Sequence, residues 1–340
     1  MQTKEDKRIK NNGIFLLRVV ATCMVLIVHF GGVFPVPEFL LQSIRFCQHG
    51  VIIFFIFSGY LIAESLDRDN NIKLFYINRM CRIIPIYYTV VIINMCFLCL
   101  FGYGKLNWLR YLTFTHCILP TRNWVVWNNW AGLWTMSAFA VFYFVAPLFH
   151  KIMSNNSYRL FALFTMGGVS IVSSYVFEML GEGDSVYKYS FLWLKTCSPV
   201  VVLYQFVIGM YIFYGIKESR KKEYFLPICM LGIFGIIYDE ERFAITALMG
   251  IMFLLVIDIK TNTNTKGFKI LKIIEEYSFS IYLGHTTVMA ITGKLQEVYS
   301  FSTLMKTIID ISGTFIFVLF LHQIEKIGVI LKKYINKVIF

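Results

Sequence analysis

The chain has 340 residues, of which 57% are hydrophobic, 17% aromatic and 15% charged, and its formal net charge is +12 at pH 7. This composition is too apolar for a soluble domain and indicates a protein that crosses a membrane several times. The positive charge fits membrane topology and anionic lipid, so we expect lipid as a partner and no nucleic acid.

Apolar stretches long enough to cross hydrocarbon recur along the whole sequence. They predict an all-α membrane protein with about ten transmembrane helices, at residues 14–34, 46–65, 83–103, 127–149, 160–180, 198–216, 224–238, 243–258, 277–293 and 307–325. Of the 32 Lys and Arg, 22 fall on the side of the N-terminus and nine on the other, with Arg18 inside a helix. This asymmetry predicts that both termini are cytoplasmic. We expect one membrane domain over residues 1–340 and no appended soluble domain.

The eight cysteines lie mostly inside apolar segments and show no disulfide or zinc spacing. Cys96 and Cys99 form a C-x-x-C, but within a predicted span, where packing is the preferred interpretation over a redox role. We therefore expect no metal site. The first apolar run is long and is followed by further spans, so it does not read as a cleavable signal peptide.

The first predicted helix carries two ionisable side chains in the apolar run LLRVVATCMVLIVHFGG. Arg18 and His29 are 11 residues apart, so at about 100° per residue they leave nearly the same helix face, about 16 Å apart along the axis. Either residue alone is explained by snorkelling or by a hydrogen bond in the core. Their alignment favours a functional stripe, because ionisable groups in a membrane are costly and usually face a cavity or a partner.

Small and basic residues mark the second and third predicted spans. The stretch FFIFSGYLI places Ser58 beside Gly59, and such small residues allow close helix packing. In FYINRMCRIIPIYY, Arg79 and Arg82 are neighbours on a helix at the cytoplasmic side, and we expect Pro85 in the first turn of that helix. The two arginines either fix the topology or clamp phosphate groups, for which paired guanidinium forks are suited.

Tryptophans gather before the fourth predicted span. The stretch RNWVVWNNWAGLWTMS spaces them by three and four residues, on one helical face at the outer boundary: Trp124, Trp127, Trp130 and Trp134. An interfacial aromatic belt is the default interpretation. A carbohydrate platform is the alternative, because aromatic faces also stack on sugar rings.

The seventh and eighth predicted spans form a hairpin with short arms. About 15 apolar residues in each arm rise only about 22 Å, which is less than the roughly 30 Å of a hydrocarbon core. The hairpin tip, residues 239–242, has the sequence DEER. We expect this tip, with Asp239 and Glu240, to lie below the outer surface in the wall of an outward-facing polar cavity.

The ninth predicted span, YSFSIYLGHTTVM, is rich in polar residues. It contains Ser278, Ser280, Tyr282, Gly284, His285, Thr286 and Thr287. His285 lies about 13 Å along the helix from Glu276, near the middle of the membrane. A second membrane histidine among hydroxyl groups favours a polar cavity over a core histidine that is only hydrogen-bonded.

Six pieces of the sequence, in this order, resemble the acyltransferase 3 family of integral-membrane surface-polysaccharide O-acyltransferases. They are the Arg18 and His29 spacing, FFIFSGYLI, NRMCRIIPIYY, LWTMSAFAVFYFVAPLF, FVIGM and YSFSIYLGH. The resemblance implies a multi-pass protein of the bacterial inner (cytoplasmic) membrane. It implies transfer of an acyl group from cytoplasmic acyl-CoA, usually acetyl-CoA, to a carbohydrate hydroxyl at or beyond the outer face.

One position departs from the family pattern. The family commonly has Ser-Val-Glu where this chain has Ser137, Ala138 and Phe139, so the acidic residue is missing. If that carboxylate orients a base or polarises the acceptor, this chain uses another group, works without one, or serves a different acyl group or acceptor.

The resemblance and the spacing together give a hypothesis for the site. His29 acts as the general base toward the sugar hydroxyl or carries the acyl group, Arg18 contacts the donor chain or its thioester carbonyl, and His285 supports one of them. The residues assigned to the donor are Arg79, Arg82, Ser58 and Tyr282. Those assigned to the carbohydrate acceptor are Trp130, Trp134, Asp239 and Glu240.

Two other functions remain open at this point. A transporter or flippase of a lipid-linked sugar would line its path with the same ionisable residues, although no repeat of hydropathy is evident. A catalytically inactive acyltransferase-like module would account for the missing glutamate. The sequence also leaves open whether the chain forms a homo-oligomer.

Overall fold

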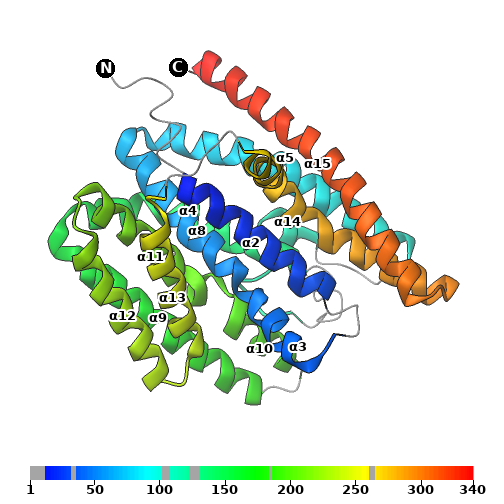
Figure 1. The fold of residues 1–340 in the computed structure, drawn as a ribbon, viewed down its shortest axis with the longest axis horizontal. Coiled ribbons are helices and arrows are strands. Elements are labelled where there is room, and N and C mark those ends of the chain that lie inside the picture. The colour runs from blue at the N-terminus through cyan, green and yellow to red at the C-terminus, as the bar shows by residue number, and fades with distance from the viewer. Residues whose placement is uncertain are drawn as a thin grey trace. The chain divides into compact units, whose positions relative to one another are not determined.

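The structure of this chain is a computed structural model that describes residues 12–31, 36–101, 108–121, 131–183, 186–259 and 265–339. Within these residues each regular element is a helix (Figure 1). The predicted all-α class is thereby confirmed for the described part of the chain.

The helices follow the predicted spans closely. In the first half they are α2 (Asn12–Gly31), α3 (Glu38–Phe46), the 3-10 turn η1 (Cys47–His49), α4 (Gly50–Arg68), α5 (Ile72–Leu100), α6 (Trp108–Leu112), the 3-10 turn η2 (Ala131–Leu133) and α8 (Trp134–Ser154). In the second half they are α9 (Asn156–Gly183), α10 (Lys188–Cys197), α11 (Pro199–Lys217), α12 (Lys221–Ile237), α13 (Glu241–Val256), α14 (Lys266–Tyr299) and α15 (Thr303–Ile339). Each predicted range overlaps one long helix.

Among the described residues, seven helices are long and apolar enough to cross a membrane by length and composition. The other three predicted ranges fall in α12, α13 and α14. Helices α12 and α13 have 17 and 16 residues, which confirms the short arms of the predicted hairpin. The structure therefore supports a multi-pass protein, while the total of ten spans and the orientation of the termini remain predictions.

The chain divides into two compact units. The first contains Met1–Asn70, Val145–Ser173 and Val200–Ser278, and the second contains Asn71–Phe144, Ser174–Pro199 and Phe279–Phe340. Helices α2, α4, α11, α12 and α13 belong to the first unit, whereas α5, α10, α15 and most of α14 belong to the second.

Two glycines bring α4 and α11 of the first unit into backbone contact. A Cβ atom on Gly59 would collide with the carbonyl oxygen of Phe206, and one on Gly209 would collide with that of Ile56. The predicted packing role of the Ser58–Gly59 pair is therefore confirmed for Gly59. In the same unit, α12 and α13 lie side by side as a hairpin (Figure 1).

The pair formed by α5 and α15 is the main helix packing of the second unit (Figure 1). The expected position of Pro85 is wrong, since α5 begins at Ile72, where the Asn71 side chain accepts a hydrogen bond from the backbone N–H of Leu74. Pro85 therefore lies in the helix interior, where it has no N–H to donate to the carbonyl of Cys81. Gly328 of α15 packs directly on that carbonyl.

Candidate functional site

Arg18 lies on α2 in the first unit and forms an ion pair with Glu275 of α14. Its guanidinium group also lies 5.1 Å from the centre of the Phe57 ring on α4. Both charged side chains are mostly buried, with exposed fractions of 18% for Arg18 and 24% for Glu275. The charge of Arg18 is thus balanced by the Glu275 carboxylate. The sequence did not indicate a role for Glu275.

His29 lies in the last turn of the same helix. Helix α2 runs without a break from Asn12 to Gly31, so the predicted helical register between Arg18 and His29 is confirmed. The His29 side chain is half-buried. Gly50, at the start of α4, allows that helix to pack closely on α2 at Ala21 and Met24, which holds the middle of α2 within the unit.

The hairpin tip between α12 and α13 separates the two predicted acceptor residues. Glu240 is 7% exposed and its carboxylate forms an ion pair of 2.8 Å with Arg242. Asp239 is exposed and adopts a left-handed backbone conformation, with φ 57°. The hydroxyl of Tyr204 on α11 donates to the backbone carbonyl of Arg242 at 3.3 Å. The tip is therefore anchored on the unit through Glu240 and Arg242, while Asp239 points to the surface.

His285 lies inside the second unit and is 1% exposed. Its Nδ1 atom lies 2.9 Å from the carbonyl oxygen of Ile281, one turn earlier on α14. A carbonyl only accepts hydrogen bonds, so Nδ1 carries the hydrogen, and the neutral ring then has its lone pair on Nε2. The side-chain amide of Asn94 on α5 donates to the hydroxyl of Thr287 at 2.9 Å. His285 thus contacts neutral groups, the Ile281 carbonyl and the ring of Tyr282.

The start of α8 packs against the same part of α14. A Cβ atom on Gly132 would collide with the Thr286 hydroxyl, so only glycine allows this approach. Tyr282 shares a side-chain hydrogen bond with Thr135, and its ring centre lies 6.2 Å from that of His285. Tyr282 is therefore next to His285 inside the second unit.

Of the predicted acceptor tryptophans, Trp134 lies among the described residues. Trp134 begins α8 and is half-buried. Trp124, Trp127 and Trp130 lie outside the described residues.

The two predicted phosphate-binding arginines lie within α5 rather than before it. Arg79 is half-buried, and its guanidinium lies 5.3 Å from the ring centre of Phe75 and 5.7 Å from that of Tyr143. Arg82 is exposed. Arg79 is therefore held by two aromatic rings, whereas the Arg82 side chain lies on the exposed surface of the protein.

Phe139, the residue that departs from the family pattern, contacts the ring of Tyr143, which in turn lies beside Arg79. Phe139 on α8 stands one turn before Tyr143, with their ring centres 5.9 Å apart. Ser137 is buried and donates a hydrogen bond to the carbonyl of Phe114, whereas Ser58 on α4 is half-buried. Aromatic rings thus occupy the part of α8 where the family has a carboxylate.

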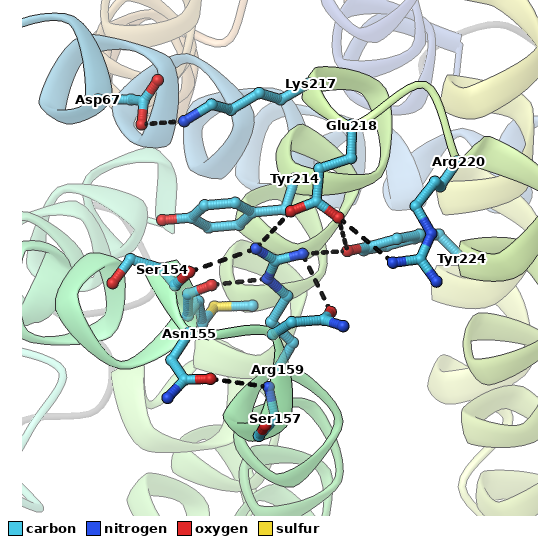
Figure 2. A network of polar contacts seen from close by, with 12 residues as sticks. Asp67, Ser154, Asn155, Ser157, Arg159, Tyr214, Lys217, Glu218, Arg220 and Tyr224 are labelled. Atoms are coloured by element: carbon cyan, nitrogen blue, oxygen red, sulfur yellow. Dashed lines mark hydrogen bonds and ion pairs between the residues drawn. The ribbon is translucent and has the colours of Figure 1, made fainter.

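The largest polar network of the first unit was missed by the sequence analysis (Figure 2). Arg159 is 3% exposed and donates to the carbonyl of Met153 at 2.7 Å, while its charge pairs with Glu218 at 2.7 Å. It also donates to the hydroxyl of Tyr224 and lies 4.3 Å from the ring centre of Tyr214. The hydrogen bond from Arg159 lowers the pKa of the Glu218 carboxyl below its ordinary value of 4.5. This network ties α9 to α11 and α12.

The sequence offered little signal for Glu275 and Arg159. Glu275 is separated from Arg18 by 257 positions. In the sequence, Glu275 and Arg159 each resemble an ordinary charged residue at the end of a span. In the part of the chain that the structure describes, no three His, Cys, Asp or Glu side chains are grouped so as to hold a metal ion.

Comparison with known proteins gives one family and two distant relatives. The family model described as an acyltransferase domain matches residues 11–322. Nodulation protein 10 of Rhizobium leguminosarum bv. viciae is 25% identical over 165 residues, which are 42% of this chain and 44% of that protein. Peptidoglycan O-acetyltransferase OatA of Listeria monocytogenes is 22% identical over 320 residues, 78% of this chain and 49% of that protein. The chain thus spans less than half the length of either relative, and no solved structure matches it.

Proposed function

Because the chain belongs to the acyltransferase 3 family, we propose that it transfers an acyl group from cytoplasmic acyl-CoA to a hydroxyl of a cell-surface or lipid-linked carbohydrate. The observation that carries this proposal is the family match over residues 11–322. The name of the Listeria relative describes O-acetylation of peptidoglycan, a polymer that contains carbohydrate, and supports acetyl as the acyl group. Acetyl-CoA is therefore the proposed donor.

The reacting groups are proposed to lie along α2. His29 takes the proton of the acceptor hydroxyl as its oxygen attacks the thioester carbonyl carbon, and the thiolate of CoA leaves and is protonated. In the alternative route His29 itself attacks and carries the acyl group to the acceptor. Arg18, about 16 Å from His29 along the helix axis, contacts the acyl-pantetheine arm of the donor and not the reacting carbon. Glu275 fixes the orientation of Arg18 by the ion pair described above.

The nucleotide end of the donor is proposed to bind at α5. A multiply charged CoA does not enter hydrocarbon, so its phosphates stay near the cytoplasmic end of the helix, beside Arg79 and Arg82. The rings of Phe75 and Tyr143 hold Arg79 by cation–π contacts, which keeps its planar guanidinium ready for a bidentate bond to phosphate. Ser58 and Tyr282 are proposed to contact the acyl-pantetheine arm.

His285 is proposed as a positioning residue. Its Nδ1–H bond to Ile281 sets the ring so that Nε2 accepts a hydrogen bond, from the donor or from a group that orients the base. On the acceptor side, we propose stacking of sugar rings on Trp130 and Trp134 and hydrogen bonds to Asp239 and Glu240.

The proposed topology has ten spans, including the short arms α12 and α13, with both termini in the cytoplasm. The bacterial cytoplasmic membrane is the proposed location, because there acyl-CoA is available on one side and the surface carbohydrate on the other.

The experiment uses the full chain, purified and reconstituted in liposomes, with radiolabelled acetyl-CoA and candidate glycans. His29→Ala should abolish transfer of label to the glycan, whereas Arg79→Ala or Arg82→Ala should raise the donor KM with little change in kcat. His322→Gln changes a buried histidine of α15 that has no proposed role, and serves as the control. Turnover of the His29→Ala protein at the wild-type rate would contradict the mechanism, and glycan movement without consumption of acetyl-CoA would contradict the proposed function.

A catalytically inactive family member is a second candidate function, favoured by one observation. Phe139 stands where the family has a glutamate, and its neighbour Tyr143 contacts Arg79. Acetyl-CoA binding without transfer to any glycan would support this candidate, and detection of the O-acyl product would exclude it.

A further inference from the structure

The segment between α5 and α8 is folded onto the second unit as far as the structure describes it. It begins with the short helix α6, Trp108–Leu112. The hydroxyl of Tyr87 on α5 donates to the backbone carbonyl of Tyr111 at 2.7 Å, and that of Tyr88 donates to the carbonyl of Leu112 at the same distance. These bonds hold residues 108–121, called here the α5–α8 segment, against α5.

The far end of the α5–α8 segment packs on α10. The backbone N–H of Thr121 donates to the hydroxyl of Ser190 at 2.9 Å. Cys117 is 0% exposed and Cys197, the last residue of α10, is 2% exposed. The two side chains are hydrogen-bonded to each other, although they are 80 positions apart in sequence. No disulfide joins these two described residues in this structure.

The local environment of Cys117 favours its thiolate form. Burial raises the pKa of this thiol, but the hydrogen bond from Cys197 and the neighbouring His116 outweigh burial and lower the pKa to about 6. The thiolate is the form that attacks disulfides. His116 is held in place by a contact of 3.0 Å between its Nε2 and the carbonyl oxygen of Leu133.

The geometry points to a disulfide between Cys117 and Cys197 that joins the α5–α8 segment to α10. In the proposed topology both cysteines are on the outer side of the membrane, where oxidising conditions allow disulfides to persist. The inference does not depend on the acyl-transfer activity, because it uses only the burial of the two thiols, their contact and the side of the membrane.

The oxidant is a thiol–disulfide oxidoreductase or a small disulfide of that compartment. Before the segment packs, Cys117 loses its proton as an exposed thiol and attacks one sulfur of the oxidant, and the other sulfur leaves as a thiol after taking up a proton. The Cys197 thiolate then attacks the Cys117 sulfur of this mixed disulfide and releases the second thiol of the oxidant. The protein loses two hydrogens and the oxidant gains them. Burial of both sulfurs afterwards protects the bond from exchange.

The disulfide would also stabilise the surroundings of His285. The carbonyl of Phe114, in the same segment, accepts the hydrogen bond of Ser137 on α8, and the turn before α8 contacts Thr286 through Gly132. Holding the segment to α10 therefore limits movement of the start of α8. Reduction should lower the Tm of the protein by roughly 3 to 7 °C.

The test counts reactive cysteines in the full chain isolated from bacterial membranes, with the membranes dissolved directly in denaturant that contains the thiol-blocking reagent. Six of the eight cysteines should be blocked in the wild-type protein, and the other two should become reactive only after reduction. Cys117→Ser should leave all seven remaining cysteines free, because Cys197 loses its partner; Cys197→Ser should do the same for Cys117. The control, Cys96→Ser, should show five free cysteines and two protected ones.

Peptide mapping identifies the pair without any variant. A peptide that links Cys117 to Cys197 in the unreduced wild-type protein is the expected result. Eight free thiols in the unreduced protein, or a linkage between other cysteines, would overturn the inference. Because the count is made in denaturant, it does not depend on whether a serine variant folds.

Discussion

Around Arg18 the chain keeps a full charge in an apolar setting, whereas around His285 it uses groups that are neutral. The Arg18 guanidinium is balanced by the Glu275 carboxylate, and its remaining surface lies over the Phe57 ring. His285 instead contacts a backbone carbonyl and lies beside the neutral ring of Tyr282.

This difference predicts how much stability a substitution costs in each region. Removing one member of a largely buried ion pair leaves an uncompensated charge, which is costly. Removing one neutral hydrogen-bonding group leaves its partner unsatisfied, which costs about 1–3 kcal/mol. Loss of activity in the Arg18 region therefore has to be separated from loss of folding. In the His285 region the two effects are easier to distinguish.

The largest effect is expected for Glu275→Ala. Arg18 then lacks its carboxylate, and the free energy of unfolding should fall by about 3–5 kcal/mol. Thermal unfolding in detergent measures this. The double variant with Arg18→Met and Glu275→Met removes both charges and should recover most of the free energy of unfolding. Its acyl transfer should stay lost if Arg18 contacts the donor. A single variant as stable as the wild type would show that the ion pair does not hold this region.

A smaller effect on folding, but a large one on rate, is expected for His285→Ala. With the fold retained, kcat should fall by about 10²-fold, at the lower end of what a positioned imidazole contributes. The pH profile of kcat provides a second readout, because a purely structural role would leave its shape unchanged. If the profile and the rate both match those of His322→Gln, His285 has no part in the reaction.

Tyr143→Leu should mainly weaken donor binding. The aromatic face beside Arg79 is lost, and a cation–π contact of roughly 0.5–1 kcal/mol corresponds to a two- to five-fold rise in the donor KM, with kcat nearly unchanged. Steady-state kinetics with varied acetyl-CoA measure this. An unchanged KM would place the donor phosphates away from Arg79.

The smallest effect is the pH dependence of the Arg159 network. The folded pKa of Glu218 is lowered, so its contribution to stability is present above the ordinary value of 4.5 and is lost as the pH falls through the lower folded value. Glu218→Gln should therefore lower the Tm by a few degrees at pH 7 and make it less sensitive to acid below about pH 4.5. Identical Tm profiles of both proteins between pH 3 and 7 would rule out this contribution.

The helices were largely predictable because long apolar runs have few other stable arrangements in a membrane. Their ends were harder, as α5 shows. Pro85 was expected in the first turn of its helix, yet Asn71 caps a helix that already starts at Ile72. Local capping, rather than hydropathy, sets that boundary.

The candidate site was predictable only in part. Arg18, His29 and His285 were found because polar groups are conspicuous in apolar helices. The partner Glu275 was missed, since a carboxylate at the end of a span has an ordinary explanation and its contact with Arg18 joins positions 257 residues apart. Asp239 and Glu240 shared one prediction, but only Glu240 is buried, because the left-handed turn at Asp239 directs the two side chains differently.

The most direct test of the account is analysis of the surface carbohydrate of bacteria that carry the wild-type protein or His29→Ala. NMR and mass spectrometry measure the O-acyl esters on the purified polysaccharide. The account predicts an ester, most simply acetyl, with the wild-type protein and its loss with His29→Ala at equal protein abundance. The same ester content in both strains would contradict the account.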